Sequence, residues 1–258
     1  MRKLPSAVRQ ARIRERLAAA PSVSIATLAA EFRVSGMTVR RDLAVLEGQA
    51  QVQRTHGGAV LTERMILEFD YRDRRELNGP VKRAIAAEAR KLITPGQRVI
   101  LDTGTTTLEL AALLRDAEDL TVITPSLAVA SELQHAPGVE VVLLGGVIRR
   151  GSPDLTGPVT EHCLELFAAD LAFQGADGIG EDGAIYNSDL RLARVDRLMR
   201  QLAARSCVLA DSSKLGVTAL AKSGTLGDVD FFITDTASPR AALQRFARLG
   251  PKVITVTA

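Results

Sequence analysis

Several segments of the chain combine glycine, hydroxyl and charged side chains in the way that a phosphate site requires. The clearest is the run DTGTTT, which follows the apolar residues RVIL and leads into an apolar-periodic stretch. Glycine lets a backbone approach a ligand, while converging N–H groups, threonine hydroxyls and a helix dipole favour an anion. Taken alone, the run is equally typical of an ordinary threonine-capped helix. Its candidate residues are Asp102, Thr103, Gly104, Thr105, Thr106 and Thr107.

Similar side chains follow other apolar runs further along the chain. They are Ser126 after LTVIT, Gly145 and Gly146 after VVLL, Asp177 after LAFQ, and Lys214 after SCVLA. Gathered along one sheet edge, these groups suit a phosphorylated polyol. Lys214 would balance the phosphate charge, and Asp102 or Asp177 would accept sugar hydroxyls.

A second kind of chemistry is indicated near the N-terminus, in the stretch SGMTVRRDLAVLE. Ser35 is placed to cap a helix whose inward stripe is Val39, Leu43 and Leu46. The other face carries small polar groups and guanidinium groups, which a helix needs to enter the major groove of DNA. Each arginine alone is at least as typical of a solvated helix face. The candidate DNA contacts are Ser35, Gly36, Met37, Thr38, Arg40 and Arg41, with Arg54 and His56 following the helix.

The elements that position this helix are short. Apolar periodicity predicts a first helix over about residues 6–20 and a second that begins near Ser24. After the third helix, AQVQRTHGGAVL alternates apolar and polar residues and turns at Gly57-Gly58, which predicts a two-stranded wing. Residues 1–60 therefore form a winged helix-turn-helix domain.

Charge separates this domain from the rest of the chain. Residues 1–60 hold ten Lys and Arg against four Asp and Glu, a net charge of +6, whereas the whole chain of 258 residues carries +3. The remainder is therefore mildly acidic. A basic end joined to an acidic body indicates that the first domain contacts a polyanion.

The body alternates strands and helices. Residues 61–80 mix charged and apolar side chains and end in the turn signal Asn-Gly-Pro, so they are interpreted as a linker. From residue 81 to 258, runs such as RVILD, LTVIT, VEVVLL, SCVLAD and KVITVTA alternate with amphipathic stretches. This pattern predicts a larger doubly wound, mostly parallel α/β domain that binds its ligand at the carboxyl ends of the strands.

Composition excludes several classes. No apolar run is long enough for a membrane helix, and the N-terminus lacks the apolar core of a signal peptide, so a cytoplasmic protein is expected. Cys163 and Cys207 lack a CxxC partner, and the three histidines lack zinc-ligand spacing, so no metal and no cofactor are expected.

No nucleophile-histidine pair or paired-carboxylate motif in the sequence supports catalytic turnover. The run from Gly178 to Gly183 fits GxGxxG, but no apolar helix follows it, so it is interpreted as a turn.

The stretch VSIATLAAEFRVSGMTVRRDLAVLE with RTHGGA resembles the DNA-binding domain of DeoR-type bacterial transcriptional regulators. LDTGTT, DLAFQGADGI and LADSSKLG are similar to the sensor domain of the same family, whose fold is like that of ribose-5-phosphate isomerase. The resemblance covers nearly the whole chain. It implies a repressor, a homodimer or homotetramer, that binds double-stranded operator DNA and is released by a phosphorylated sugar. The alternative is an active sugar-phosphate isomerase fused to a DNA-binding module.

The chain departs from the family pattern at four positions. Arg33 stands where a smaller turn residue is common, and Ala50 where the wing usually has glycine. Arg194 and Asp196 replace the usual glutamate and lysine, which either inverts a salt bridge or alters the effector pocket. Gly36 and Met37 are the variable pair of the helix motif, so operator preference is expected to depend on them.

Overall fold

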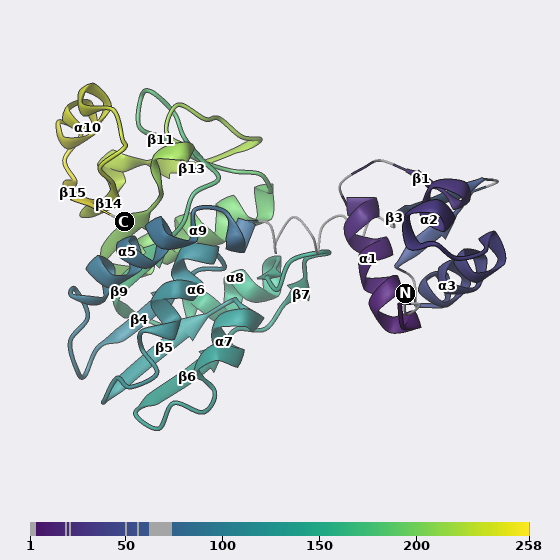
Figure 1. Cartoon of the computed structure of the whole chain (residues 1–258). Coiled ribbons are helices and arrows are strands. Elements are labelled where there is room, and N and C mark those ends of the chain that lie inside the picture. Colours follow the sequence, from purple (N-terminus) through teal and green to yellow (C-terminus); the bar gives the residue numbers. More distant parts are fainter. Residues whose placement is uncertain are drawn as a thin grey trace. The chain divides into compact units, whose positions relative to one another are not determined.

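The computed structural model describes residues 4–18, 20, 22–49, 51–55, 57–61 and 74–257. It forms two compact units, of which the second begins at Arg74 (Figure 1). Each unit has a hydrophobic core of its own.

Within its described residues, the first unit has three helices and a small sheet. Its elements are α1 (Ser6–Ala18), β1 (Val23–Ser24), α2 (Ile25–Phe32), α3 (Gly36–Gly48), β2 (Val52–Arg54) and β3 (Gly58–Leu61). The strands pair antiparallel in the order β1-β3-β2. The predicted helices and wing strands are confirmed, whereas β1 is too short to leave a periodic signal in the sequence.

The predicted inward stripes form the core of this first domain. Val39, Leu43 and Leu46 of α3 are fully buried, and they share one cluster with Ile13 of α1 and Leu28 of α2. Serine caps begin two of the helices as expected. The Oγ atom of Ser24 accepts a hydrogen bond from Thr27 N at 3.0 Å, and that of Ser35 accepts one from Thr38 N at 3.2 Å.

The second unit alternates helices and strands as its sequence predicts. Its helices are α5 (Gly79–Arg90), α6 (Thr105–Ala112), α7 (Leu127–Leu133), α8 (Pro158–Glu165), α9 (Leu190–Leu202) and α10 (Arg240–Ala247). Its main sheet contains β4 (Arg98–Leu101), β5 (Leu120–Thr124), β6 (Val139–Leu143), β9 (Ala169–Gln174), β12 (Ala203–Leu209), β14 (Phe231–Asp235) and β15 (Lys252–Val256).

The main sheet is parallel throughout, in the order β15-β14-β12-β9-β4-β5-β6. From β4 the chain proceeds outward through β5 to β6. It then returns to the other side of β4, where β9 begins a second series through β12 and β14 to β15. The direction of winding therefore reverses between β4 and β9. In doubly wound sheets, ligands bind at the carboxyl ends of the strands beside this switch point.

Helices cover both faces of the sheet. Alternate strand residues, such as Val99 and Phe173, pack against α5, α6 and α7. Their neighbours Ile100 and Ala172 face the opposite way and pack against α8 and α9. This alternation follows from the two-residue period of a strand. The predicted doubly wound parallel fold is confirmed.

Two small antiparallel sheets lie beside the main one. The first contains β10 (Gly178–Ile179), β11 (Ala184–Asn187) and β13 (Ala221–Thr225), and the second contains β7 (Val147–Ile148) and β8 (Leu155–Thr156). The GxGxxG run forms β10 and the turn to β11, in which Gly183 N donates to Gly180 O at 2.9 Å. Its interpretation as a turn is confirmed.

Candidate functional site

The third helix of the first unit presents a polar face. Arg40 and Arg41 are exposed, and Met37 is 57% exposed, whereas the opposite stripe of α3 is buried. Ser35 is exposed and caps the helix, with its Oγ 3.0 Å from Thr38 Oγ1. A capped helix N-terminus beside two exposed guanidinium groups has the charge and the hydrogen-bond donors that phosphate and base edges require.

A buried ion pair holds α3 against α1. Arg9 Nε donates to Asp42 Oδ2 at 2.5 Å and Arg9 Nη2 to Asp42 Oδ1 at 3.0 Å, while Ser6 Oγ donates to Asp42 Oδ1 at 2.8 Å. Both charged side chains are less than one-tenth exposed. Burial alone would raise the pKa of Asp42, but the bonds from Arg9 and Ser6 outweigh it and lower the pKa. Asp42 therefore belongs to the domain interior and not to the polar face.

The wing arginine has a partner within the domain. Arg54 Nε lies 2.6 Å from Glu47 Oε2 near the end of α3, and Arg54 N donates to Glu47 Oε1 at 3.3 Å. This contact ties β2 to α3. The other predicted wing contact, His56, lies outside the described residues, as does Ala50.

Arg33, in the turn between α2 and α3, adopts the left-handed conformation with φ 53°. It follows α2 directly, and Val34 N donates to Ala29 O at 3.0 Å. A smaller or more permissive residue is favoured at such a position because a side chain with a Cβ is strained there. This explains why a smaller residue is common at this turn, while the presence of arginine here has no structural explanation.

In the second unit, Asp102 lies at the switch point of the main sheet. Its Oδ1 accepts hydrogen bonds from Gly104 N at 2.8 Å and from the Thr107 hydroxyl, and its Oδ2 accepts one from Gly175 N at 2.5 Å. The carboxylate therefore joins the ends of β4 and β9. Burial raises the pKa of Asp102 to about 6, although these donors act to lower it.

The predicted site residues differ in their solvent exposure. Thr106 and Thr107 are buried, whereas Thr103, Gly104 and Thr105 are half-buried. The side chain of Ser126 is used as the cap of α7, because its Oγ accepts a bond from Val129 N at 3.2 Å. The predicted site residues that remain at least partly accessible lie at the start of α6 and at the ends of β6, β9 and β12.

Gly145 and Gly146 occupy a tight turn after β6. Gly146 has φ 144°, and a Cβ there would overlap the Thr160 hydroxyl, which donates to Gly145 O at 2.8 Å. Packing against α8 thus requires glycine at this position. Lys214 follows β12, which is four strand positions from β6. At roughly 4.8 Å per strand this separation is about 19 Å, so one phosphate cannot contact both ends.

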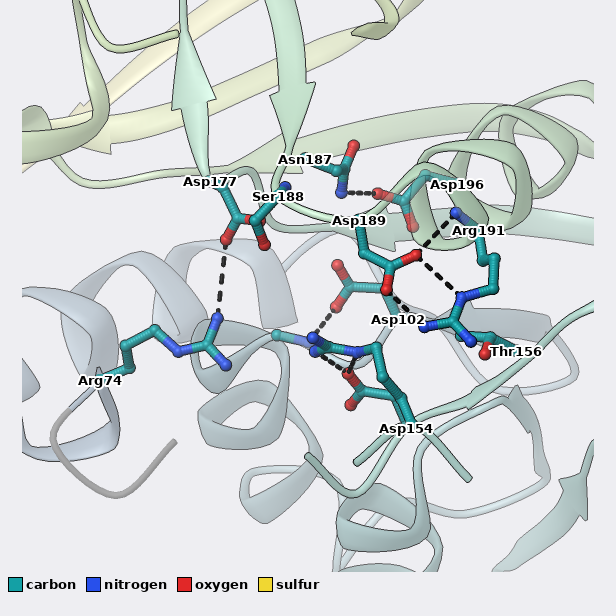
Figure 2. A network of polar contacts seen from close by, with 12 residues as sticks. Arg74, Asp102, Asp154, Thr156, Asp177, Asn187, Ser188, Asp189, Arg191 and Asp196 are labelled. Carbon is teal, nitrogen blue, oxygen red and sulfur yellow. Dashed lines mark hydrogen bonds and ion pairs between the residues drawn. The ribbon is translucent and has the colours of Figure 1, made fainter. Parts of the chain in front are cut away.

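Asp177 and Lys214 lie on the other side of β4. Asp177 Oδ2 accepts bonds from Ser188 N and Ser188 Oγ, both at 2.7 Å, and its Oδ1 lies 3.6 Å from Arg74 Nη1 (Figure 2). Lys214 ends a short 3-10 helix capped by Asp211, which accepts from Ser213 N at 3.0 Å. The structure thus brings Asp102, Asp177 and Lys214 to three adjacent strand ends.

Lys82, a buried lysine near these strand ends, was not predicted from the sequence. Lys82 is 5% exposed, and its ammonium donates to the Arg74 carbonyl oxygen. Burial lowers the pKa of Lys82, while the Asp211 carboxylate raises it and the Lys214 ammonium lowers it further. The signal in the sequence was a lysine on the apolar stripe of α5, one turn before Ile85 and Ala86.

Asp196, one of the departures from the family pattern, is also buried at this site. It is 4% exposed, and its Oδ2 accepts from Asn187 Nδ2 at 2.7 Å (Figure 2). Burial and the Asp102 carboxylate raise the pKa of Asp196 to about 8, so the carboxyl group is protonated at neutral pH. Arg194 instead pairs with Glu161 on α8 at 3.0 Å. Arg194 and Asp196 therefore do not form an inverted pair with each other.

The four arginines of α9 have partners in their own domain, although Arg191, Arg194 and Arg197 are exposed. Arg191 pairs with Asp189, and Arg200 Nη1 donates to Gln174 Oε1 at 2.7 Å. Arg197 Nε donates to Ser223 O at 3.4 Å. Among the residues that the structure describes, no group of three or more His, Cys, Asp or Glu side chains could hold a metal ion. In that same part of the chain, every helix is too short or too polar to cross a membrane.

Comparison with known proteins covers both units. The family model described as DeoR-like helix-turn-helix domain matches residues 9–65, and the one described as DeoR C terminal sensor domain matches residues 78–236. A protein of Escherichia coli O157:H7, provisionally named the aga operon transcriptional repressor, is 36% identical over 96% of this chain and 93% of its own. The glycerol-3-phosphate regulon repressor of Escherichia coli K12 is 30% identical over 86% and 88%.

Among solved structures, ribose 5-phosphate isomerase A of Methanocaldococcus jannaschii matches 54% of this chain and 55% of its own. It does so with 22% sequence identity and a TM-score of 0.40. A likeness at this level carries no argument about chemistry.

Proposed function

Because the chain belongs to the DeoR family of transcriptional regulators, we propose that it represses a carbohydrate catabolic or transport operon, and that a phosphorylated sugar releases it from its operator. The proposal has two parts, operator binding by α3 and effector binding at the strand ends. The observation that carries it is the presence of both kinds of site in one chain. Two exposed arginines lie on a capped helix, and two lysines lie at the carboxyl end of a parallel sheet.

For DNA, the proposed contacts are Ser35, Gly36, Met37, Thr38, Arg40 and Arg41, with Arg54 and His56 in the wing. Arg40 and Arg41 would grip phosphates or guanine edges, and Met37, exposed on the same helix, would contact a base. Pairing of two sensor domains in a homodimer or homotetramer would place two α3 helices on a palindrome, one helical turn of DNA or a multiple of it apart.

For the effector, the proposed site lies at the ends of β4, β9 and β12. Lys214 and Lys82 would balance the phosphate charge, and the half-buried start of α6, at Thr103, Gly104 and Thr105, would donate hydrogen bonds. Asp177 would accept sugar hydroxyls. Asp102 would shape the loop, since both of its oxygens already accept internal bonds. Thr106, Thr107, Ser126, Gly145 and Gly146 would support the site through packing and capping.

The experiment is a titration of the full chain with labelled DNA from upstream of neighbouring transport or catabolic genes, followed by fluorescence anisotropy. Arg41→Ala is expected to weaken operator binding about tenfold or more, which is the effect of losing one bidentate base contact. Lys214→Ala should bind DNA normally but no longer respond to sugar phosphates. Lys252→Ala, an exposed lysine at the opposite edge of the sheet, is the matched control.

Each outcome decides one part of the proposal. Equal affinity for operator and scrambled DNA would overturn the operator assignment. A normal response of Lys214→Ala to the effector would overturn the position of the phosphate site. Product formation from ribose or fructose phosphates would instead favour an active isomerase. Asp102, Asp177 or Asp211 could be proposed as its base, but each of them already accepts hydrogen bonds within the domain.

A further inference from the structure

The first residues of the second unit lie across the strand ends of the proposed effector site. We call Arg74 to Lys82 the lead-in segment, because it follows directly on the residues that connect the two domains in sequence. Arg74 Nη1 lies 3.6 Å from Asp177 Oδ1 at the end of β9, as Figure 2 shows. Asn78 Nδ2 donates to Asp211 Oδ1 at the end of β12, at 3.1 Å. The segment is thus attached to two of the three strand ends.

A third contact involves the main chain of the segment. The carbonyl oxygen of Arg74 accepts a hydrogen bond from the Lys82 ammonium and one from Thr105 Oγ1 at 3.4 Å. Thr105 is the first residue of α6, in the loop with the predicted phosphate-binding pattern. A single backbone oxygen is therefore held by the lysine and the hydroxyl that would bind a phosphate oxygen.

The charges around Lys82 make this contact weaker than the one a phosphate would form. Among the described residues, the Arg74 carbonyl is the hydrogen-bond acceptor of the buried Lys82 ammonium. The nearby Asp211 carboxylate already accepts bonds from Ser213 and Asn78, and Lys214 adds a second positive charge. The Asp211 and Glu109 carboxylates offset part of the positive charge of Lys82, Lys214 and Arg74, and the neutral carbonyl oxygen adds no charge of its own. A phosphate oxygen would bring a negative charge to the same place, which strengthens its bond to the Lys82 ammonium.

We infer that the Arg74 carbonyl oxygen occupies the place of a phosphate oxygen, and that a phosphorylated sugar which binds Lys82 and Thr105 displaces the lead-in segment from the strand ends. The inference rests on the proposed effector site and adds its regulation. Displacement also frees Asp177 from Arg74, so its carboxylate becomes available to a sugar hydroxyl. Because the segment continues directly into the chain that leads to the DNA-binding domain, effector binding and operator release share one moving element.

Competition between the segment and the ligand sets the apparent affinity. If the segment covers the site nine-tenths of the time, the ligand binds about tenfold more weakly than to an open site. A change that loosens the segment should therefore tighten ligand binding. Asn78→Ala removes the bond to Asp211 and places a Cβ-bearing residue without local hydrogen-bonding at φ 57°, so it loosens the segment in two ways.

The test uses the full chain and four probes, namely inorganic phosphate, ribose 5-phosphate, fructose 6-phosphate and glycerol 3-phosphate. Binding is measured by calorimetry, and hydrogen exchange is followed in peptides over residues 74–78 and 102–107. A bound probe is expected to speed exchange about fivefold or more in 74–78 and to slow it in 102–107. Asn78→Ala should bind that probe three- to tenfold more tightly, while Arg75→Ala, an exposed neighbour, should match the wild type. Lys82→Met should lose binding.

The outcomes separate this inference from the proposed function. One outcome is that a probe releases the protein from its operator while hydrogen exchange in residues 74–78 slows or stays the same. That result would contradict displacement of the lead-in segment but not the proposed effector site. Wild-type affinity in Asn78→Ala, or a normal response in Lys82→Met, also overturns the displacement. Failure of all four probes to bind overturns both the effector site and its displacement. Faster exchange together with tighter binding by Asn78→Ala supports both.

Discussion

Arg9 on α1 and Asp42 on α3 form a bidentate ion pair in the interior of the first domain, with both side chains less than one-tenth exposed. The pair fixes the helix that carries the proposed DNA contacts to the helix that begins the domain. The position of the proposed DNA contacts therefore depends on Asp42, although Asp42 itself does not face the DNA.

Asp42→Asn should destabilise the first domain by about 3–5 kcal/mol, because it leaves the Arg9 charge buried without its partner. Thermal unfolding followed by circular dichroism would measure the change. Arg16→Ala is the control, since Arg16 and Glu31 form an exposed pair expected to contribute about 0–1 kcal/mol. The folded pKa of Asp42 lies below the ordinary value of 3.8, so its contribution is present above that pH and lost as the pH falls through the folded pKa. Equal destabilisation by the two variants would contradict this account.

Glu47→Ala should strengthen binding to any duplex DNA, because it releases Arg54 from the ion pair that ties β2 to α3. A freed arginine that reaches one phosphate makes the slope of log K against log salt more negative by about 0.9. Anisotropy titrations at several salt concentrations would measure the slope. Glu88→Gln, which removes a charge from an exposed pair in the second domain, is the control. If the double variant Glu47→Ala/Arg54→Ala kept the steeper slope, the released arginine would not be its cause.

Asp196→Asn should make the stability of the second domain less dependent on pH. The unfolded chain loses this proton near the ordinary value of 3.8, whereas the folded chain keeps it to about pH 8. The folded state therefore holds the extra proton, and its stability falls as the pH rises from about 4 to 8. Removing the ionisable group should abolish this fall, so the Asn variant should gain about 4 kcal/mol relative to the wild type between pH 5 and pH 9, at about 1.4 kcal/mol per pH unit up to pH 8. Urea unfolding at both pH values would show it, and parallel curves for the two proteins would refute the assignment.

Gly146→Ala should destabilise the second domain whether or not an effector is present. The new Cβ would overlap the Thr160 hydroxyl at a backbone position with φ 144°, so packing and backbone strain add to about 3 kcal/mol or more. Gly157→Ala is the matched control, because Gly157 also has a positive φ, 97°, but has nothing within 4 Å of the added Cβ. A loss of about 1–2 kcal/mol is expected there. Similar melting temperatures for the two variants would show that the overlap with Thr160 does not contribute to the destabilisation.

Most of the helices, strands and caps could be predicted from local sequence patterns. Ser24 and Ser35 cap the helices they were expected to cap, since a cap depends on residues within one turn. The order of the main sheet could not be obtained in this way, because β4 pairs with β9, which is distant in sequence. The bond that Asp102 accepts from Gly175 N at the end of β9 could not be predicted for the same reason. The expectation that Asp102 or Asp177 accepts sugar hydroxyls stays a prediction.

Lys82 itself and the burial of Asp196 were overlooked, because the inner stripe of a helix is expected to be apolar. Both stand on such a stripe, Lys82 before Ile85 and Asp196 between Leu192 and Met199, and both are buried at the strand ends. A charged residue on an inner stripe is costly unless it is paired, so it marks a position worth testing for function. The resemblance to the family had singled out Asp196 but not its burial.

The place of β4 between β5 and β9 also sets the order in which the two domains can mature on the ribosome. The helices and strands that the structure describes in the first domain lie between Ser6 and Leu61, so all of them are synthesised before β4. The centre of the parallel sheet stays open on one side until β9 emerges, and β15, the last strand, comes from the end of the chain. Domains of short-range contacts fold faster than those of long-range ones. In a nascent chain, the described helices and strands of the first domain should therefore fold before the main sheet of the second domain is complete.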